Sequence, residues 1–124
     1  MQRFLTDRKR ATGLGSGHDG THHHWQMMVS SMAIVVVAPI FFVTFALGLQ
    51  GSYEEVVAYF SRPGIAIIMV ISLVVIIRHV MHEALEAVED YVHGVPGKLA
   101  LVGVTWASYI LIFVGLFAIA RMAL

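Results

Sequence analysis

Three long apolar runs, separated by short polar segments, dominate this chain of 124 residues. The runs cover residues 27–49, 63–85 and 99–120, and each is long enough to cross a hydrocarbon core of ~30 Å as a helix. The purely apolar part of the second run ends at Ile77, so this span is complete only when its polar final turns are included. The pattern predicts an all-α integral membrane protein with three transmembrane helices in one anchor unit, residues 27–124.

Polar segments mark where these helices end. Residues 1–26 are expected to form a polar arm, and its glycines indicate a flexible loop. Residues 52–61, which connect the first two spans, carry aromatic side chains at the depth of the membrane surface and could form a short surface helix. The second helix is expected to continue to about Val92 and to stop before residues 93–97, whose glycines and proline break it.

The second span carries an unusual polar end, residues 79–91, with the sequence HVMHEALEAVEDY. At 3.6 residues per turn, one stripe of this helix holds four ionisable side chains, with His82 on its flank: His79, Glu83, Glu86 and Asp90. The stripe places His79 at membrane depth and facing protein, with Asp90 and Tyr91 near the membrane surface. An ionisable side chain inside a spanning helix is costly, which indicates a functional role.

Composition supports the membrane assignment and removes several kinds of chemistry. Hydrophobic residues make up 58% of the chain, charged residues 13%, and the mean hydropathy is +0.79. Without cysteine the chain forms no disulfide, no thiolate metal site and no cysteine-ligated iron–sulfur cluster. A formal net charge of zero gives no reason to expect nucleic acid as a partner. The polar arm ahead of the first run does not resemble a removable signal peptide.

The distribution of basic residues predicts the orientation. Six of the eight lysines and arginines lie in the N-terminal arm or around the loop between the second and third spans, and the other two are Arg62 and Arg121. By the positive-inside rule, we expect a cytoplasmic N-terminus and a periplasmic C-terminus in a bacterial inner membrane.

A single buried histidine leaves several chemical roles open. His79 could relay protons, bind a metal, bind haem, or simply hydrogen-bond to a neighbouring helix as a neutral side chain. A carboxylate-bridged metal site would need ligands from several helices, and the other two spans have no Asp, Glu or His in their apolar cores. His79 and His82 are one turn apart, so they cannot ligate iron from opposite faces of a haem. A six-coordinate haem would require a second polypeptide.

The pattern of His79, ten residues and then Asp90-Tyr91, at one end of the second of three spans, resembles the smaller membrane anchor subunit of succinate dehydrogenase. The length, the span layout and the arm agree with this resemblance, which covers essentially the whole chain. The arm sequence TDRKRATGLGSG and the later EDYVHG are most similar to the alphaproteobacterial branch.

The resemblance implies a role for each matching residue. His79 corresponds to an axial ligand of haem b, Tyr91 to a hydrogen-bond donor to a ubiquinone carbonyl, and Asp90 to its neighbour in that pocket. His23 and His24 both fit the position of a histidine near a haem propionate; the run His22-His23-His24 also fits a metal tract or a polar interfacial segment.

Two positions depart from the family pattern or lack a family role. Many relatives carry an arginine early in the first span, where this chain has methionines and serines, so that arginine would come from a partner. His82 has no ligand role in the family and is interpreted as an interfacial histidine near the haem edge.

The implied partners are a larger cytochrome b-type anchor subunit, an iron–sulfur subunit, a flavoprotein subunit and the lipid bilayer. In such a complex, succinate is oxidised at the flavoprotein and electrons pass through iron–sulfur clusters to ubiquinone. This chain alone would catalyse nothing, because it has no dinucleotide-binding motif and no cysteine. Two alternatives remain open: the anchor of a quinone-linked fumarate reductase, and a structural membrane anchor without a cofactor.

Overall fold

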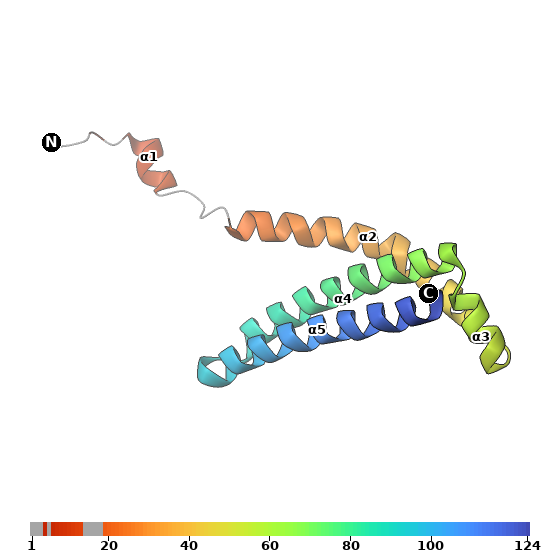
Figure 1. The fold of residues 1–124 in the computed structure, drawn as a ribbon. Coiled ribbons are helices and arrows are strands. Elements are labelled where there is room, and N and C mark those ends of the chain that lie inside the picture. The colour runs from red at the N-terminus through yellow and green to blue at the C-terminus, as the bar shows by residue number, and fades with distance from the viewer. Residues whose placement is uncertain (1–3, 5, 14–18) are drawn as a thin grey trace.

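The computed structural model of the protein describes residues 4, 6–13 and 19–124 and is all-helical over them (Figure 1). Arg3 and the glycine-rich residues 14–18 lie outside the described part. The helices are α1 (Asp7–Thr12), α2 (Asp19–Gly48), α3 (Tyr53–Phe60), α4 (Pro63–Tyr91) and α5 (Gly94–Ala123). Within the described residues, three segments are long and apolar enough to span a membrane: His22–Gly48, Pro63–Tyr91 and Gly94–Ala123. The predicted class, all-α with three transmembrane helices, is confirmed.

The ends of the helices differ from the sequence prediction at two places. The first long helix begins at Asp19, eight residues before the apolar run at Met27, so part of the expected flexible arm is helical. A helix that has already formed is extended at little cost, because each added residue loses only its own conformational freedom. A 3.0 Å contact between Gln26 Nε2 and His22 Nε2 also joins successive turns of this extension. The third spanning helix, α5, begins at Gly94, inside the segment 93–97 that was expected to break helix. Its proline is tolerated because it lies in the first turn, where a backbone N–H has no partner within the helix.

Helices α4 and α5 form an antiparallel hairpin with a tight turn (Figure 1). Only Val92 and His93 separate them, and Gly94 adopts a positive φ of 73°. Farther along, Gly115 lets the helices approach closely, because a Cβ there would lie 2.5 Å from Leu73 Cδ2. A side chain at position 115 would therefore force the Leu73 side chain to move or the two helices to separate.

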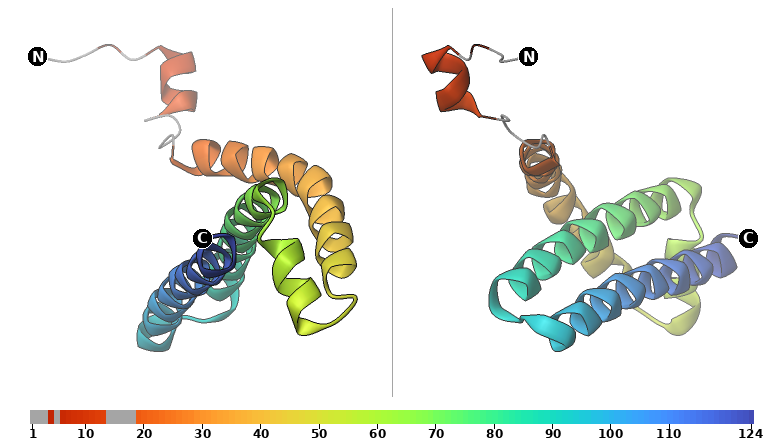
Figure 2. Two further views of the ribbon diagram at one scale, coloured as in Figure 1. Left: turned by 45° about the vertical axis from the view of Figure 1, so that its right-hand side comes forward. Right: turned by 90° about the vertical axis from the view of Figure 1, so that its left-hand side faces the viewer.

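Helix α2 packs on α4 and diverges from it toward the N-terminus of α2 (Figures 1 and 2). It also bends along its length, and it contains Pro39, which has no N–H to give to the carbonyl of the preceding turn. The short connection 52–61 is helical, as expected. Helix α3 begins with a capping box in which Ser52 and Glu55 exchange hydrogen bonds with each other's backbone N–H.

The arrangement gives the bundle two polar ends about 30 to 45 Å apart. The start of α2, the end of α4 and the start of α5 lie at one end, and α3, the start of α4 and the C-terminus lie at the other (Figure 1). Large apolar side chains such as Trp106, Phe113 and Phe117 are mostly exposed in this chain on its own. Such surfaces are suited to contact lipid or other membrane subunits.

Candidate functional site

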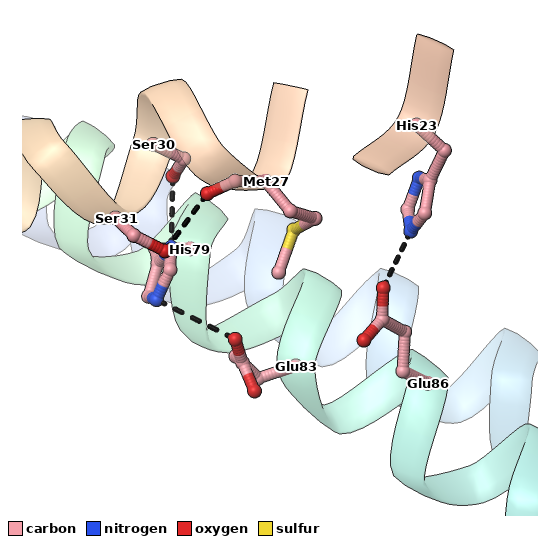
Figure 3. Close-up of polar contacts among 7 residues, drawn as sticks. All are labelled: His23, Met27, Ser30, Ser31, His79, Glu83 and Glu86. Atoms are coloured by element: carbon pink, nitrogen blue, oxygen red, sulfur yellow. Dashed lines mark hydrogen bonds and ion pairs between the residues drawn. The ribbon is translucent and has the colours of Figure 1, made fainter. Parts of the chain in front are cut away.

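His79 lies where α2 and α4 face each other, at about the middle of α4 (Figure 3). Its side chain is only 15% exposed, so the expectation that it faces protein is confirmed. Ser30 Oγ of α2 lies 2.8 Å from His79 Nδ1. On the other side of the ring, Nε2 lies 3.7 Å from Glu83 Oε1, one turn farther along α4. The imidazole is thus held from α2 through one nitrogen, and its second nitrogen faces a carboxylate.

A second polar contact joins the same two helices (Figure 3). His23 Nε2 of α2 lies 2.7 Å from Glu86 Oε1 of α4. The two contacts are seven residues apart on each helix, which is about 10 Å along the axis. Met27 is buried between them. His23 and Ser30 therefore fix the register of antiparallel α2 on the polar end of α4.

The structure separates the two arm histidines that the sequence left equivalent. His23 faces α4, where its ring also meets the ring of His82 edge-on, with 5.9 Å between centroids. His24 is about 100° farther around the helix and is exposed. Of the two, His23 belongs to the same face of α2 as Ser30.

Asp90 and Tyr91 occupy the last turn of α4 and point away from the body of this chain. Both are exposed, and Tyr91 retains 84% of its accessible surface. Twelve residues of helix place Tyr91 about 18 Å along α4 from His79. This chain therefore does not enclose Asp90 and Tyr91 by itself, and a pocket around them would need walls from another subunit.

A cavity of about 570 Å³ opens between the diverging parts of α2 and α4. Its polar lining consists of His22, His23, Trp25, Gln26, Ser30, Arg78 and His82. His79, Asp90 and Tyr91 do not line it. This cavity could not be predicted from the sequence, because its walls come from segments about fifty residues apart.

Comparison with known proteins decides the family. Residues 2–120 match the family described as succinate dehydrogenase/fumarate reductase transmembrane subunit. The chain belongs to this family. It is also similar to the succinate dehydrogenase hydrophobic membrane anchor subunit of Paracoccus denitrificans, with 37% identity over 122 residues, which are 98% of this chain and 95% of that protein. No solved structure matches the chain.

The resemblance predicted from the histidine and Asp-Tyr pattern is thus confirmed at the level of the family. A succinate dehydrogenase/fumarate reductase transmembrane subunit is a multi-pass membrane protein, in agreement with the three long helices. Membership in the family also implies association with the catalytic subunits of such an enzyme.

His79 of this transmembrane subunit suits a single axial ligand. A ligating histidine commonly donates its other ring N–H to a fixed acceptor, and Ser30 Oγ stands in that position at Nδ1. If this histidine held an iron, Nε2 would be the available nitrogen, and the exposed Glu83 side chain would have to turn aside. Among the residues that the structure describes, no group of three or more His, Asp or Glu is placed to hold a metal ion.

Sequence reasoning missed the role of Ser30. It noted Ser30 and Ser31 only as the residues that replace an arginine at the start of the first span. The available signal was a hydroxyl in an otherwise apolar helix, since such side chains usually bond to a neighbouring helix or to their own backbone. The structure shows both kinds of contact. Ser30 Oγ contacts His79 of the neighbouring helix, and Ser31 Oγ donates to the Met27 carbonyl oxygen of its own helix at 2.8 Å.

Proposed function

We propose that this chain is the hydrophobic membrane anchor subunit of a succinate:ubiquinone oxidoreductase. It tethers the flavoprotein and iron–sulfur subunits to the membrane, shares haem b with a larger anchor subunit, and completes part of the ubiquinone-reduction site. The observation that carries the proposal is the buried imidazole of His79, oriented by Ser30 from the facing helix, in a chain of this family.

In the proposed complex, His79 would hold the iron of haem b, and the larger anchor subunit would supply the second ligand. When bound, the haem offers a site that accepts and releases single electrons. This chain's contribution is to hold the ligand: Ser30 Oγ accepts the Nδ1–H, which keeps the Nε2 lone pair available. His23, on the same face of α2 and two turns toward the membrane surface, would be available to hold a propionate.

Asp90 and Tyr91 are proposed to serve ubiquinone. Reduction to ubiquinol takes two electrons and two protons, and negative charge grows on a carbonyl oxygen before it is protonated. The phenol of Tyr91 donates a hydrogen bond to that oxygen, and the bond strengthens as the charge develops. The Asp90 carboxylate can relay protons from the aqueous side. The exposure of both side chains in the isolated chain supports a pocket completed by partner subunits.

The proposal is tested by capturing the complex from its native membranes through a tag on this chain. We expect flavoprotein and iron–sulfur subunits to co-purify and the preparation to reduce ubiquinone with succinate as the electron donor. A preparation that oxidises quinol with fumarate but does not reduce ubiquinone with succinate would favour the fumarate reductase anchor. Capture of the chain without catalytic subunits would contradict the proposal.

Replacing Ser30 with alanine tests how His79 is held. Losing one neutral hydrogen bond costs about 1 kcal/mol, so haem affinity is expected to fall about fivefold. The reduction potential of the haem should also shift, because the Nδ1–H of its ligand loses its acceptor. Ser31→Ala is the matched control, since Ser31 bonds only within α2. Equal haem affinity and potential in both variants would show that Ser30 does not orient the ligand.

The proposed orientation places the start of α2 on the cytoplasmic side and the C-terminus on the periplasmic side. The chain has no cysteine, so single-cysteine variants can be labelled without background. Ala11→Cys in α1 should react only when the reagent reaches the cytoplasm, whereas Leu124→Cys should react from the periplasm in intact cells. Labelling of both positions from the same side would contradict a three-span anchor.

A further inference from the structure

The cavity between α2 and α4 is polar at the end near the N-terminus of α2 and apolar at its other end. Toward the N-terminus of α2 it is lined by the polar set named above, which includes Trp25, Gln26, Arg78 and His82. The remaining side chains are small or apolar and include Val29, Ala33, Val74 and Val75. A ligand that fits both ends is an amphiphile with a polar head and a hydrocarbon tail.

The depth of these residues agrees with the plane of a membrane. A hydrocarbon core of ~30 Å needs about 20 helical residues. Counted from Pro63, the core of α4 ends near residue 82, and counted back from Gly48, the core of α2 ends near residue 29. Trp25, Gln26 and His82 then lie in the headgroup region, and Val75 and Ala33 lie within the hydrocarbon, with Arg78 one turn below the surface.

Charge distinguishes the cavity from an ordinary groove between helices. The guanidinium of Arg78 and the imidazoles of His22 and His82 line it, and no carboxylate does. Two carboxylates of α4 are already directed to histidines, Glu83 to His79 and Glu86 to His23, and the second of these histidines itself lines the cavity. Among the described residues, no Asp or Glu forms an ion pair with Arg78.

From these observations we infer that the cavity binds an anionic phospholipid of the leaflet on the side of the N-terminal arm. The phosphate lies against Arg78 with hydrogen bonds from His82 and Gln26, and an acyl chain follows Val75 and Ala33 into the membrane. Basic pockets between transmembrane helices recognise such headgroups, and a tryptophan at the rim is typical of headgroup depth. The bound lipid fills the space between the diverging helices. Of the residues that line the cavity, His23 and Ser30 also serve the proposed haem site, whereas Arg78, Gln26, Val75 and Ala33 do not.

The test measures lipid bound to the intact complex. The complex, purified in a neutral detergent, is incubated with mixed micelles of phosphatidylglycerol or phosphatidylcholine, washed, and analysed by native mass spectrometry. We expect one phosphatidylglycerol to remain per copy of this chain. Arg78→Gln should reduce its retention about fivefold or more, since one cation near the membrane surface is worth about that factor. Val75→Trp, which fills the apolar part, should also displace it, and Lys98→Gln, a cation of the same membrane side outside the cavity, should not.

Haem content and succinate–ubiquinone activity are measured on the same preparations, so this inference and the proposed function fail separately. Equal retention of phosphatidylglycerol in Arg78→Gln and Val75→Trp would overturn the lipid site, as would equal retention of phosphatidylcholine by the unmodified complex. A variant that loses haem while its bound lipid stays unchanged would assign Arg78 to a haem carboxylate instead, and would also overturn it.

Discussion

Replacing His79 with alanine is expected to remove the low-spin b-type haem signal of the complex. The substitution deletes the proposed ligand outright, so the loss of haem should exceed the fall expected from weakening the support of that ligand in Ser30→Ala. The helices should still insert, because the lost Ser30–His79 contact contributes only about 1 kcal/mol, against three apolar spans that remain intact. Haem stoichiometry and the electron paramagnetic resonance spectrum of the purified complex provide the measurement.

His82→Ala is the matched control for this experiment. His82 lies one turn from His79 on the same helix, and its ring contacts the ring of His23. We expect this variant to keep a six-coordinate, low-spin haem. Loss of the low-spin spectrum in His82→Ala, with its retention in His79→Ala, would transfer the ligand role to His82.

Tyr91→Phe is expected to slow ubiquinone reduction roughly a hundredfold. The change keeps the aromatic ring and deletes one donor, and a donor aimed at a developing oxyanion is worth about 3 kcal/mol. Folding should be unaffected, because Tyr91 is 84% exposed at the end of α4. Oxidation of succinate with an artificial acceptor that bypasses the membrane site should stay normal, and so should the haem spectrum.

Tyr53→Phe provides the comparison for Tyr91. Tyr53 is 83% exposed and lies at the opposite end of the bundle, at the start of α3. If both tyrosines were ordinary interfacial aromatic residues, neither variant would change ubiquinone reduction. Near-normal activity in Tyr91→Phe would leave the quinone role of this residue without support.

The apolar pattern predicted the membrane helices better than it predicted their ends. Hydrocarbon requires each span to satisfy its own backbone hydrogen bonds, so a long apolar run has little choice but helix. No such constraint acts on polar residues at the membrane surface. Residues 19–26 therefore extended a helix where the glycines of the arm had indicated a loop, and the chain re-entered helix at Gly94 despite Pro96.

The candidate site was only partly predictable for a related reason. Position along one helix is set by the sequence, so the stripe from His79 to Asp90 could be placed correctly on α4. Contacts between helices depend on register and crossing angle, which no local pattern fixes. The pairing of Ser30 with His79, the choice of His23 over His24, and the cavity beside Arg78 all required the packing of α2 on α4.

We propose above that this family member shares a haem b with a partner subunit through His79 and contributes to a ubiquinone-reducing complex. A dithionite-reduced minus oxidised optical spectrum of the complex captured through this chain tests it most directly. We expect a b-type spectrum with one haem per copy of the chain. His79→Ala complexes that still contain the catalytic subunits should lack this spectrum. A complex that reduces ubiquinone with succinate but shows no b-type band, or an unchanged band in His79→Ala, would contradict it.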